Sequence, residues 1–394
     1  MVKNVMKKIV RMTDIFQPIF THTNINNNNN SSKIQKNILY FINLTNLHIY
    51  EQLLVEESLY RLSSCLSTRL NKIGFFVIND TTKSSIKNIE NNDRKIKHSS
   101  NNYSPNNKCV VLGMSRKTKE HTNDINYIKK NNILLIKRYT GGGTVYINNN
   151  CILASLILPN DFEKETRLYP SNISEWTFNY FFKPFIQNEA NDKFTFNKTF
   201  QYHEHDFVCK INNNYKVDDK NCNIKKVGGN AQAFSKDYFV HHTSFIWDLN
   251  NFEEMEKVLS NPLKQPDYRN RRSHKDFLTP ITSCLDKNID TPDIFIQHLV
   301  TNIKHVLHKK NKLNTDEIWF FNNIQFNYNE YNLSFIKNDI FDNVDKLDIS
   351  LLKEIVYFYT NNSSIKNLRS TYFLDMYGNK VPESFYNFNP FIMG

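Results

Sequence analysis

Glycine, proline and long apolar runs are all scarce in this chain. Its 394 residues include only 9 glycines and 11 prolines, and the longest mainly apolar stretch covers residues 151–158. A membrane-spanning helix needs roughly 20 apolar residues, so no membrane partner is expected. The six cysteines contain no CxxC pair, which argues against a disulfide scaffold and a zinc ribbon. We therefore expect a soluble protein of a reducing compartment.

Positive charge, in contrast, is in excess. The formal net charge is +11 and the pI is about 9.1, a balance that favours acidic partners. The basic residues are scattered among Asn and Ser rather than gathered on one helix, so we expect no nucleic-acid partner. Phosphorylated ligands or an acidic protein explain the excess as well.

The start of the chain predicts an import signal. Residues 1–12 carry four cations between Val, Ile and Met, and no acid occurs before Asp14. A basic amphipathic start followed by a polar stretch is typical of an organelle-import leader, although a disordered basic tail fits the same residues. We interpret residues 1–36 as a basic leader and Asn-rich linker, and expect a mitochondrial location, with a plastid-type organelle as the alternative.

Asparagine runs separate the segments that carry apolar periodicity. A low-complexity insertion is predicted at about residues 80–107, where almost no such periodicity occurs. Two hairpins are expected, one from residues 144–147 and 152–158 and one from residues 207–211 and 226–234.

Helices are predicted at residues 48–68 and from Thr291 onward, where a cap, a proline and an acid follow one another. The alternation of strands and helices predicts an α+β fold of mixed β-sheets flanked by helices. Its body is placed at residues 37–310, followed by a C-terminal extension at 311–394 with a helix near 348–359.

Five of the nine glycines lie in two clusters. Residues 137–146 read Lys-Arg-Tyr-Thr-Gly-Gly-Gly-Thr-Val-Tyr, and residues 225–232 read Lys-Lys-Val-Gly-Gly-Asn-Ala-Gln. Glycine lets main-chain N–H groups approach an anion without a Cβ in the way. The first cluster fits an anion or acyl pocket, or a flexible hairpin turn. Lys226 fits a lysine that projects into a pocket, or an exposed lysine at a hairpin end.

Taken together, the two clusters resemble the motifs of the lipoate–protein ligase family. RYTGGGTVY at 138–146 resembles its Arg-Arg-x-Ser-Gly-Gly-Gly-x-Val-Tyr motif, and KVGGNAQ at 226–232 resembles its Lys-x-Ser-Gly-x-Ala-Gln motif. A histidine strand, HHTSFIWD, follows at 241–248. The resemblance covers roughly residues 48–310, is strongest to a eukaryotic branch, and implies a biotin/lipoate ligase-like catalytic domain.

The resemblance implies an enzyme that activates lipoate or octanoate with ATP and Mg²⁺ as an acyl-adenylate (lipoyl-AMP). The acyl group would then pass to a lysine of a lipoyl carrier domain: an E2 subunit of a 2-oxoacid dehydrogenase, or the glycine-cleavage H-protein. Two alternatives stay open. One is a lipoyl or octanoyl transferase that uses preformed lipoyl-AMP or another acyl donor, and the other is a non-catalytic lipoyl-binding scaffold.

The resemblance also assigns roles to individual residues. Lys226 matches the catalytic lysine of the family, and Asp206 matches an acid near the Mg²⁺ ion and the nucleotide phosphates. The positions that match the substrate and acyl-adenylate pocket are Arg138, Thr140, Gly141, Gly142, Gly143, Tyr146, Gly228, Gly229, Asn230, Ala231, Gln232 and His242.

The chain departs from the family near the nucleotide. After Tyr146 the family has His-Asp and then Gly-Asn, whereas this chain has Ile147-Asn148 and Asn150-Cys151. The Asn of the family's Asn-Asp pair is His205 here. These departures place the ATP-dependent activation step in doubt and leave Lys226 in place.

Overall fold

A computed structural model describes most of the chain. The described residues are 34–45, 47–67, 71–82, 108–187, 194–211, 223–249, 252–314, 316–327, 332–335, 346–348 and 370–386. The predicted leader up to residue 33, the predicted insertion beyond residue 82 and the predicted helix beyond residue 348 lie outside them. No helix in the described ranges combines the length and apolarity that a membrane crossing requires.

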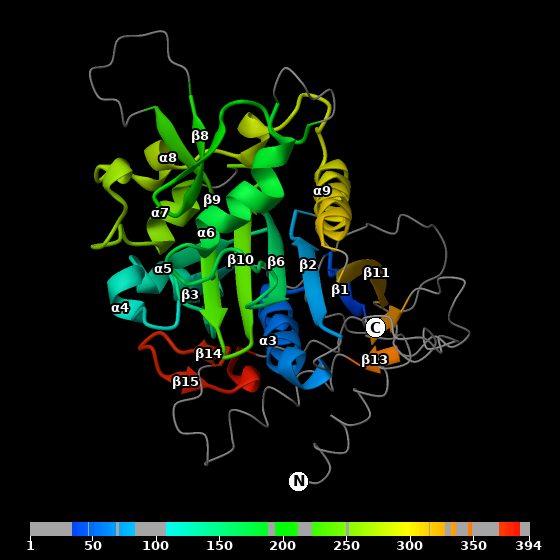
Figure 1. The fold of residues 1–394 in the computed structure, drawn as a ribbon. Helices are drawn as coiled ribbons and strands as arrows, with labels where there is room; N and C mark the ends of the chain where they lie inside the picture. The colour runs from blue at the N-terminus through cyan, green and yellow to red at the C-terminus, as the bar shows by residue number, and fades with distance from the viewer. Residues whose placement is uncertain are drawn as a thin grey trace, which may run out of the picture.

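A ten-stranded mixed sheet forms the body of the molecule (Figure 1). Its strand order is β13-β12-β11-β1-β2-β6-β10-β9-β8-β7. The neighbours β11, β1 and β2 are parallel, and the other pairs are antiparallel. The strands are β1 (Gln35–Asn43), β2 (Ile73–Asp80), β6 (Cys151–Pro159), β7 (Phe200–His203), β8 (Asp206–Lys210), β9 (Ile224–Phe234), β10 (Tyr238–Ile246), β11 (Glu317–Asn327), β12 (Asn332–Phe335) and β13 (Lys346–Asp348).

A second, five-stranded sheet has the order β15-β14-β4-β3-β5. Its strands are β3 (Cys109–Leu112), β4 (Leu134–Lys137), β5 (Thr144–Ile147), β14 (Tyr372–Leu374) and β15 (Lys380–Val381). Two mixed sheets with helices packed on them confirm the predicted α+β class.

One of the two predicted hairpins is wrong. β5 pairs with β3 in the small sheet, whereas β6 pairs with β2 and β10 in the large one. The asparagines between β5 and β6 therefore carry the chain from one sheet to the other, and each strand pairs with strands that are distant from it in the sequence. The second hairpin is confirmed, because β8 and β9 pair antiparallel.

The ten-stranded sheet has two faces with different covers. Alternation along β1 and β2 sends Leu39 and Phe76 to one face and Tyr40 and Phe75 to the other. The first, which we call the aromatic face, is covered by α6 (Ile173–Thr177), the π-helix η1 (Phe178–Phe182) and α9 (Pro292–Leu313). The second, the cavity face, is covered by α3 (Ile49–Leu66) and the small sheet.

Helix α9 begins where the sequence predicts. The side chain of Thr291 accepts a hydrogen bond from the Ile294 amide, and Pro292 occupies the first helical position. The apolar stripe of α9 packs against the aromatic face and against β11. The shorter helices are α4 (Thr118–His121), α5 (Ile125–Lys130), α7 (Phe252–Val258), α8 (His274–Phe277), η2 (Lys183–Phe185), η3 (Asp267–Arg269), η4 (Ile281–Cys284) and η5 (Glu383–Tyr386).

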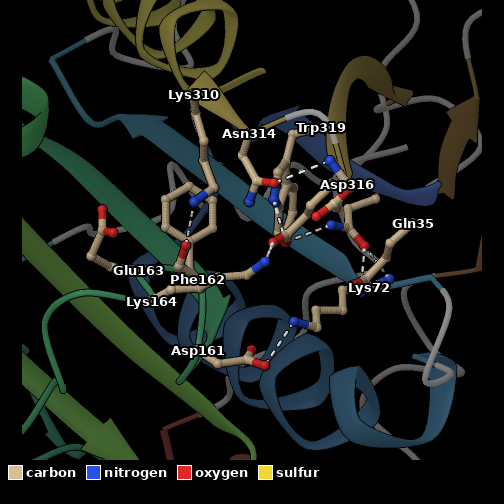
Figure 2. Close-up of polar contacts among 12 residues, drawn as sticks. Gln35, Lys72, Asp161, Phe162, Glu163, Lys164, Lys310, Asn314, Asp316 and Trp319 are labelled. Carbon is tan, nitrogen blue, oxygen red and sulfur yellow. Dashed lines mark hydrogen bonds and ion pairs between the residues drawn. The ribbon is translucent and has the colours of Figure 1, made fainter. Parts of the chain in front are cut away.

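Strands from beyond residue 310 pair with strands of both sheets, β11 with β1 and β14 with β4. The domain boundary at residue 310 stays a prediction. Figure 2 shows the polar contacts where β11 joins the sheet. The buried Glu317 carboxylate accepts hydrogen bonds from Asn37 Nδ2 at 2.7 Å and Trp319 Nε1 at 2.9 Å, and lies 3.3 Å from Lys164 Nζ.

Candidate ligand-binding site

The first glycine cluster forms a turn around Arg138. The Arg138 side chain is 4% exposed, and its Nη2 donates to the carbonyl oxygens of Gly141 and Gly143, both at 2.8 Å. Its Nη1 donates to the Val111 carbonyl at 3.3 Å. Burial lowers the pKa of Arg138 to about 10. Most of its donors thus hold main-chain carbonyls, so the guanidinium shapes the turn.

Glycine is required at two points of this turn. Gly142 has a φ of +93°, a conformation that side-chain-bearing residues rarely adopt. A Cβ added to Gly113, at the end of β3, would lie 2.4 Å from the Gly142 carbonyl oxygen. The Gly113 amide donates to the Gly143 carbonyl at 3.1 Å. The backbones of two segments therefore touch here, with no room for side chains between them.

Lys226 is aimed by an irregularity in β9. Phe207 of β8 opposes Gly228, whereas its neighbour Val208 opposes Lys226, so Val227 is an extra residue. Such a β-bulge changes which residues of a strand share a face. Lys226 and Gly229 are three residues apart, yet both line the same cavities.

Asp206 neutralises Lys226. Its Oδ1 lies 2.7 Å from Lys226 Nζ, and its Oδ2 accepts a hydrogen bond from Tyr268 Oη at 3.0 Å. The turn before it holds Glu204 and His205 at φ values of 44° and 69°, as two-residue hairpin turns demand. Both carboxylate oxygens of Asp206 thus already have partners.

These contacts do not fit the magnesium ion predicted at Asp206. Magnesium prefers carboxylate and water oxygens in an octahedral shell. Asp206 meets a lysine and a tyrosine instead, and the described part of the chain contains no group of three or more His, Cys, Asp or Glu residues that could hold a metal. A lysine ammonium 2.7 Å away would repel a divalent cation.

Two cavities meet beside Lys226. The larger has a volume of about 200 Å³ and the smaller about 100 Å³. Both are lined by Lys226, Gly143 and Gly229, so they are contiguous at the two glycine clusters. Other residues shared by both linings are Thr144, Val145, Ile147 and Ser244.

The smaller cavity is a mainly apolar slot. It runs between α3 and the strands of both sheets, and one end of its wall is polar. An unbranched acyl chain fits such a lining, because it gains from apolar burial along its length. The aliphatic lining residues are Ile49, Leu53, Val111, Val145, Ile147 and Leu153.

The larger cavity is cationic. Arg116, Lys226, Lys264 and Arg269 line it, and its described lining includes no Asp or Glu. Burial, with Arg269 nearby, lowers the pKa of the lining His274 to about 4. Lys226 is paired with Asp206 outside the lining, but Arg116, Lys264 and Arg269 face no acid within it, so the cavity suits an anionic group such as a phosphate.

A buried hydrogen-bond chain closes the smaller cavity. Thr140 Oγ1 lies 3.1 Å from His242 Nε2, and His242 Nδ1 lies 3.1 Å from Glu56 Oε2. The other oxygen of Glu56, which is fully buried, accepts from Gln52 at 2.6 Å and Ser155 at 2.7 Å. The glycine turn, β10, α3 and β6 are thereby joined at one point. Glu56, Gln52 and Ser155 were not predicted from the sequence.

The predicted pocket residues divide into two groups. Eight positions line one or both cavities, and the remainder line neither. Thr140 is fully buried against His242, and Gln232 Nε2 donates to the Pro170 carbonyl at 3.0 Å, away from the cavities. The eight are Arg138, Gly143, Tyr146, Lys226, Gly229, Asn230, Ala231 and His242, and those that line neither are Thr140, Gly141, Gly142, Gly228 and Gln232.

Five basic residues that line the larger cavity were also missed in the sequence analysis. Arg116 and His121 precede or belong to α4, and Lys264, Arg269 and His274 come from the segment between α7 and α8 and the start of α8. Residues 262–274 combine two prolines with three arginines and two other basic side chains. Such a composition is a signal for a basic loop, but only the fold brings it to the glycine turn.

Comparisons with known proteins place the chain in a family. Residues 90–304 match the lipoyl protein ligase A/B catalytic domain. The chain is also 46% identical, over 97% of its length and 98% of the relative's, to a Plasmodium falciparum protein named inactive lipoate–protein ligase 2. The chain therefore belongs to the lipoate–protein ligase family, as the motifs predict.

Solved structures with a similar architecture are more distant. One is a bipartite lipoate–protein ligase of Thermoplasma acidophilum, described with its E2 lipoyl domain: it is 16% identical, with a TM-score of 0.44, and the match covers 89% of this chain and 99% of that one. Another is P. falciparum LipL1 in complex with lipoate, at 15% identity and a TM-score of 0.41, covering 72% and 66% of the two chains.

The comparison with the Plasmodium relative corrects one expectation. The sequence predicted an active ATP-dependent lipoate–protein ligase or lipoyltransferase. A relative that shares 46% of its residues with nearly the whole chain is named as inactive, so the prediction of an active enzyme is wrong. Asp206 matches the family but is held by Lys226 and Tyr268, and the described residues contain no group that could hold a metal ion. The departures from the family motifs lie at His205, which adjoins Asp206 in the sequence, and at residues 147–151, which follow Tyr146.

Proposed function

We propose that this protein is a non-catalytic lipoyl-binding protein on a ligase fold. The observation that carries the proposal is the pair of contiguous cavities, one apolar and one cationic, which meet at Lys226. A lipoyl group would fill the apolar slot, and its carboxyl or acyl-phosphate end would face the cations.

Retention of the glycine turn supports ligand binding. Gly142 and Gly113 allow a close backbone contact beside Gly143, which lines both cavities, and an ordinary surface loop would not require such a contact. The buried chain through His242 and Glu56 holds the wall of the slot in one arrangement, and such pre-organisation lowers the entropy cost of binding.

The loss of the activation step has a matching rationale. Formation of an acyl-adenylate from ATP needs a divalent cation to offset the charge of the nucleotide phosphates. Asp206, the residue that would hold this cation, is already paired with Lys226. Solved lipoate–protein ligases include one bound with ATP and a putative one with bound lipoic acid. For this chain we propose lipoate or a lipoyl conjugate as the ligand, with no ATP turnover and no transfer.

The protein partner and the subcellular location are further parts of this proposal. The ligase of Thermoplasma acidophilum has an E2 lipoyl domain as its partner, and we propose that lipoyl carrier domains are partners here too. The basic first residues favour a mitochondrial location, with a plastid-type organelle as the alternative.

A binding experiment with one filled cavity tests the proposal. Val145 lines both cavities and is half-buried in β5, so Val145→Trp should obstruct them. We expect calorimetry to show lipoate or lipoyl-AMP binding to the unchanged protein and at least about tenfold weaker binding to the variant. Val381→Trp, at another half-buried valine of the same sheet, is the matched control.

The same preparation, supplied with Mg²⁺-ATP, lipoate and an apo lipoyl domain, should release no pyrophosphate and leave the domain unmodified. Transfer of lipoate to the domain would contradict the proposal. So would an unchanged protein that binds neither lipoate nor lipoyl-AMP.

A further inference from the structure

The segment that joins α7 to α8 forms part of the rim of the larger cavity. Pro262, Lys264 and Pro266 line the cavity, while Leu263 between them is 92% exposed. Thr122, next to α4, bridges to Leu259 at the start of this segment. In Figure 1, α4 and the segment between α7 and α8 accordingly lie on the same side of the molecule.

Two arginines hold the rim from inside. The Arg269 guanidinium donates to Asn261 Oδ1 at 2.8 Å, and Arg272 Nη2 donates to the Tyr268 and Ile224 carbonyls at 2.7 and 2.9 Å. Both guanidinium groups also lie over the ring of Phe277, at 4.8 and 5.4 Å from its centroid.

The backbone between these two arginines is strained. Asn270 and Arg271 have φ values of 47° and 57°, which is uncommon for two consecutive residues that are not glycine. Strain of this kind persists only where surrounding contacts fix it, and it is concentrated at functional sites. The arginine contacts therefore present Leu263 and Arg271 on a fixed turn.

The outward side chains of the rim are basic. Residues 261–275 contain five Lys or Arg and one Asp, which gives 5 − 1 = +4. Lys264, Arg271 and Lys275 are exposed, in contrast to the half-buried Arg272 and buried Arg269. The one aromatic residue of this segment, Tyr268, is fully buried, so the segment offers no stacking platform for the bases of single-stranded nucleic acid.

We infer that this rim, residues 261–275, is a docking surface for an acidic protein domain that carries a lipoylated lysine. The inference rests on the proposed function, because the lipoyl arm would enter the cavities behind the rim. The exposed cations would pair with acids of the domain, and Leu263 would pack against its surface. An acylated lysine is a neutral amide, whereas a free ammonium would meet Arg116, Lys264 and Arg269 and no lining acid among the described residues, the acid nearest to Lys226 being already paired with it. The surface therefore selects the modified domain.

Charge reversal at two rim positions that do not line the cavities tests the inference. We would measure binding of an acidic E2 lipoyl domain, with and without its lipoyl group, to the full-length protein at low and high salt. Arg271→Glu with Lys275→Glu should weaken binding of the lipoylated domain at least about tenfold and reduce its salt dependence. Lys309→Glu with Lys312→Glu, two exposed lysines of α9, makes the same change of net charge elsewhere and should shift binding less than about twofold.

A second pair of variants tests the apolar contact. Leu263→Ser should weaken domain binding about threefold, whereas Leu313→Ser, at a leucine 79% exposed on α9, should leave it unchanged. The lipoylated domain should bind at least about tenfold more tightly than the unmodified one.

Binding of free lipoamide separates the two proposals. If the unchanged protein binds lipoamide but both charge-reversed variants lose the domain equally, the docking surface is wrong and the proposed function stands. If lipoamide does not bind at all, the proposed function fails. Equal affinity for the lipoylated and unmodified domains would show that the rim does not select the modified lysine. If single-stranded RNA bound more tightly than the lipoylated domain, and the rim variants weakened that binding, the proposed protein partner would be wrong.

Discussion

Two neighbouring histidines of β10 show how differently the two faces of the large sheet are used. His241 points into the aromatic face, where its ring nitrogens lie 3.3 Å from Ser174 Oγ and 3.1 Å from Thr177 Oγ1. His242 points to the cavity face and bridges Thr140 and Glu56. His241 borders a cavity of only about 20 Å³ within the aromatic face, whereas His242 forms the wall of the smaller ligand cavity, of about 100 Å³. The two rings part because alternation along a strand sends adjacent residues to opposite faces.

Two fully buried carboxylates repeat this contrast. Glu317, at the junction of β11 with β1, accepts from Asn37 and Trp319 and is sealed from any cavity described here. Glu56 accepts from Gln52 and Ser155, whereas Glu317 also lies 3.3 Å from Lys164 Nζ, and Glu56 alone of the two lines the smaller cavity. Removing Glu317 should therefore affect folding, and disturbing the Glu56 chain should affect ligand binding.

The largest expected effect is on the aromatic face. Glu317→Ala leaves the buried Asn37 amide and Trp319 indole donors without their acceptor, so the free energy of unfolding should fall by about 3 kcal/mol in urea titrations. Lys72→Ala removes one partner of an ion pair in which Asp161 is 66% exposed, and should cost less than about 1 kcal/mol (Figure 2). Equal losses in the two variants would show that the Glu317 contacts do not anchor β11.

Acid should destabilise the aromatic face through His241. Burial lowers the pKa of His241 to about 3, whereas an unfolded histidine titrates near pH 6.5, so between these values the unfolded state binds one more proton. Stability is then fully present above pH 6.5 and should fall by about 2 kcal/mol from this residue on going to pH 5. In His241→Asn the slope of the unfolding free energy against pH should be smaller, by the amount that corresponds to about one bound proton.

His308→Asn, at an exposed histidine of α9, is the control for that slope and should leave it unchanged. His274, whose pKa burial also lowers, to about 4, adds to the acid dependence in the same direction. An identical slope in unchanged protein and His241→Asn would mean that His241 accepts a proton in the fold.

The smallest effect is expected on the cavity face and in a different measurement. A glutamine at position 242 cannot bridge Thr140 and Glu56 at once, so His242→Gln should weaken lipoamide binding about tenfold, or about 1.4 kcal/mol. The free energy of unfolding should change by about 1 kcal/mol or less, since Glu56 keeps its bonds from Gln52 and Ser155. If His242→Gln lowered the free energy of unfolding more than the free energy of lipoamide binding, the cavity face would be structural in the same way as the aromatic face.

The sequence by itself determined the family and much of the fold. The motifs RYTGGGTVY and KVGGNAQ, with their spacing, identified the ligase fold. Glycine is legible in such motifs because a Cβ at Gly142, or at the neighbouring Gly113, would meet other atoms at close range. The start of α9 followed from Thr291, Pro292 and Asp293, whose effects are local. Local chemistry of this kind can be read without knowing where a segment packs.

Tertiary structure decided what pattern could not. The chain crosses between sheets after β5 because each strand finds partners distant in sequence. A bulge at Val227 turns Lys226 and Gly229 to one side, and strand periodicity alone would have separated them. The pairing of Lys226 with Asp206, and the joining of Glu56 to His242 across 186 positions, depend on distances that only folding sets. Those long-range contacts, rather than the motifs, set which partner each side chain of the site has and which side chains line the cavities.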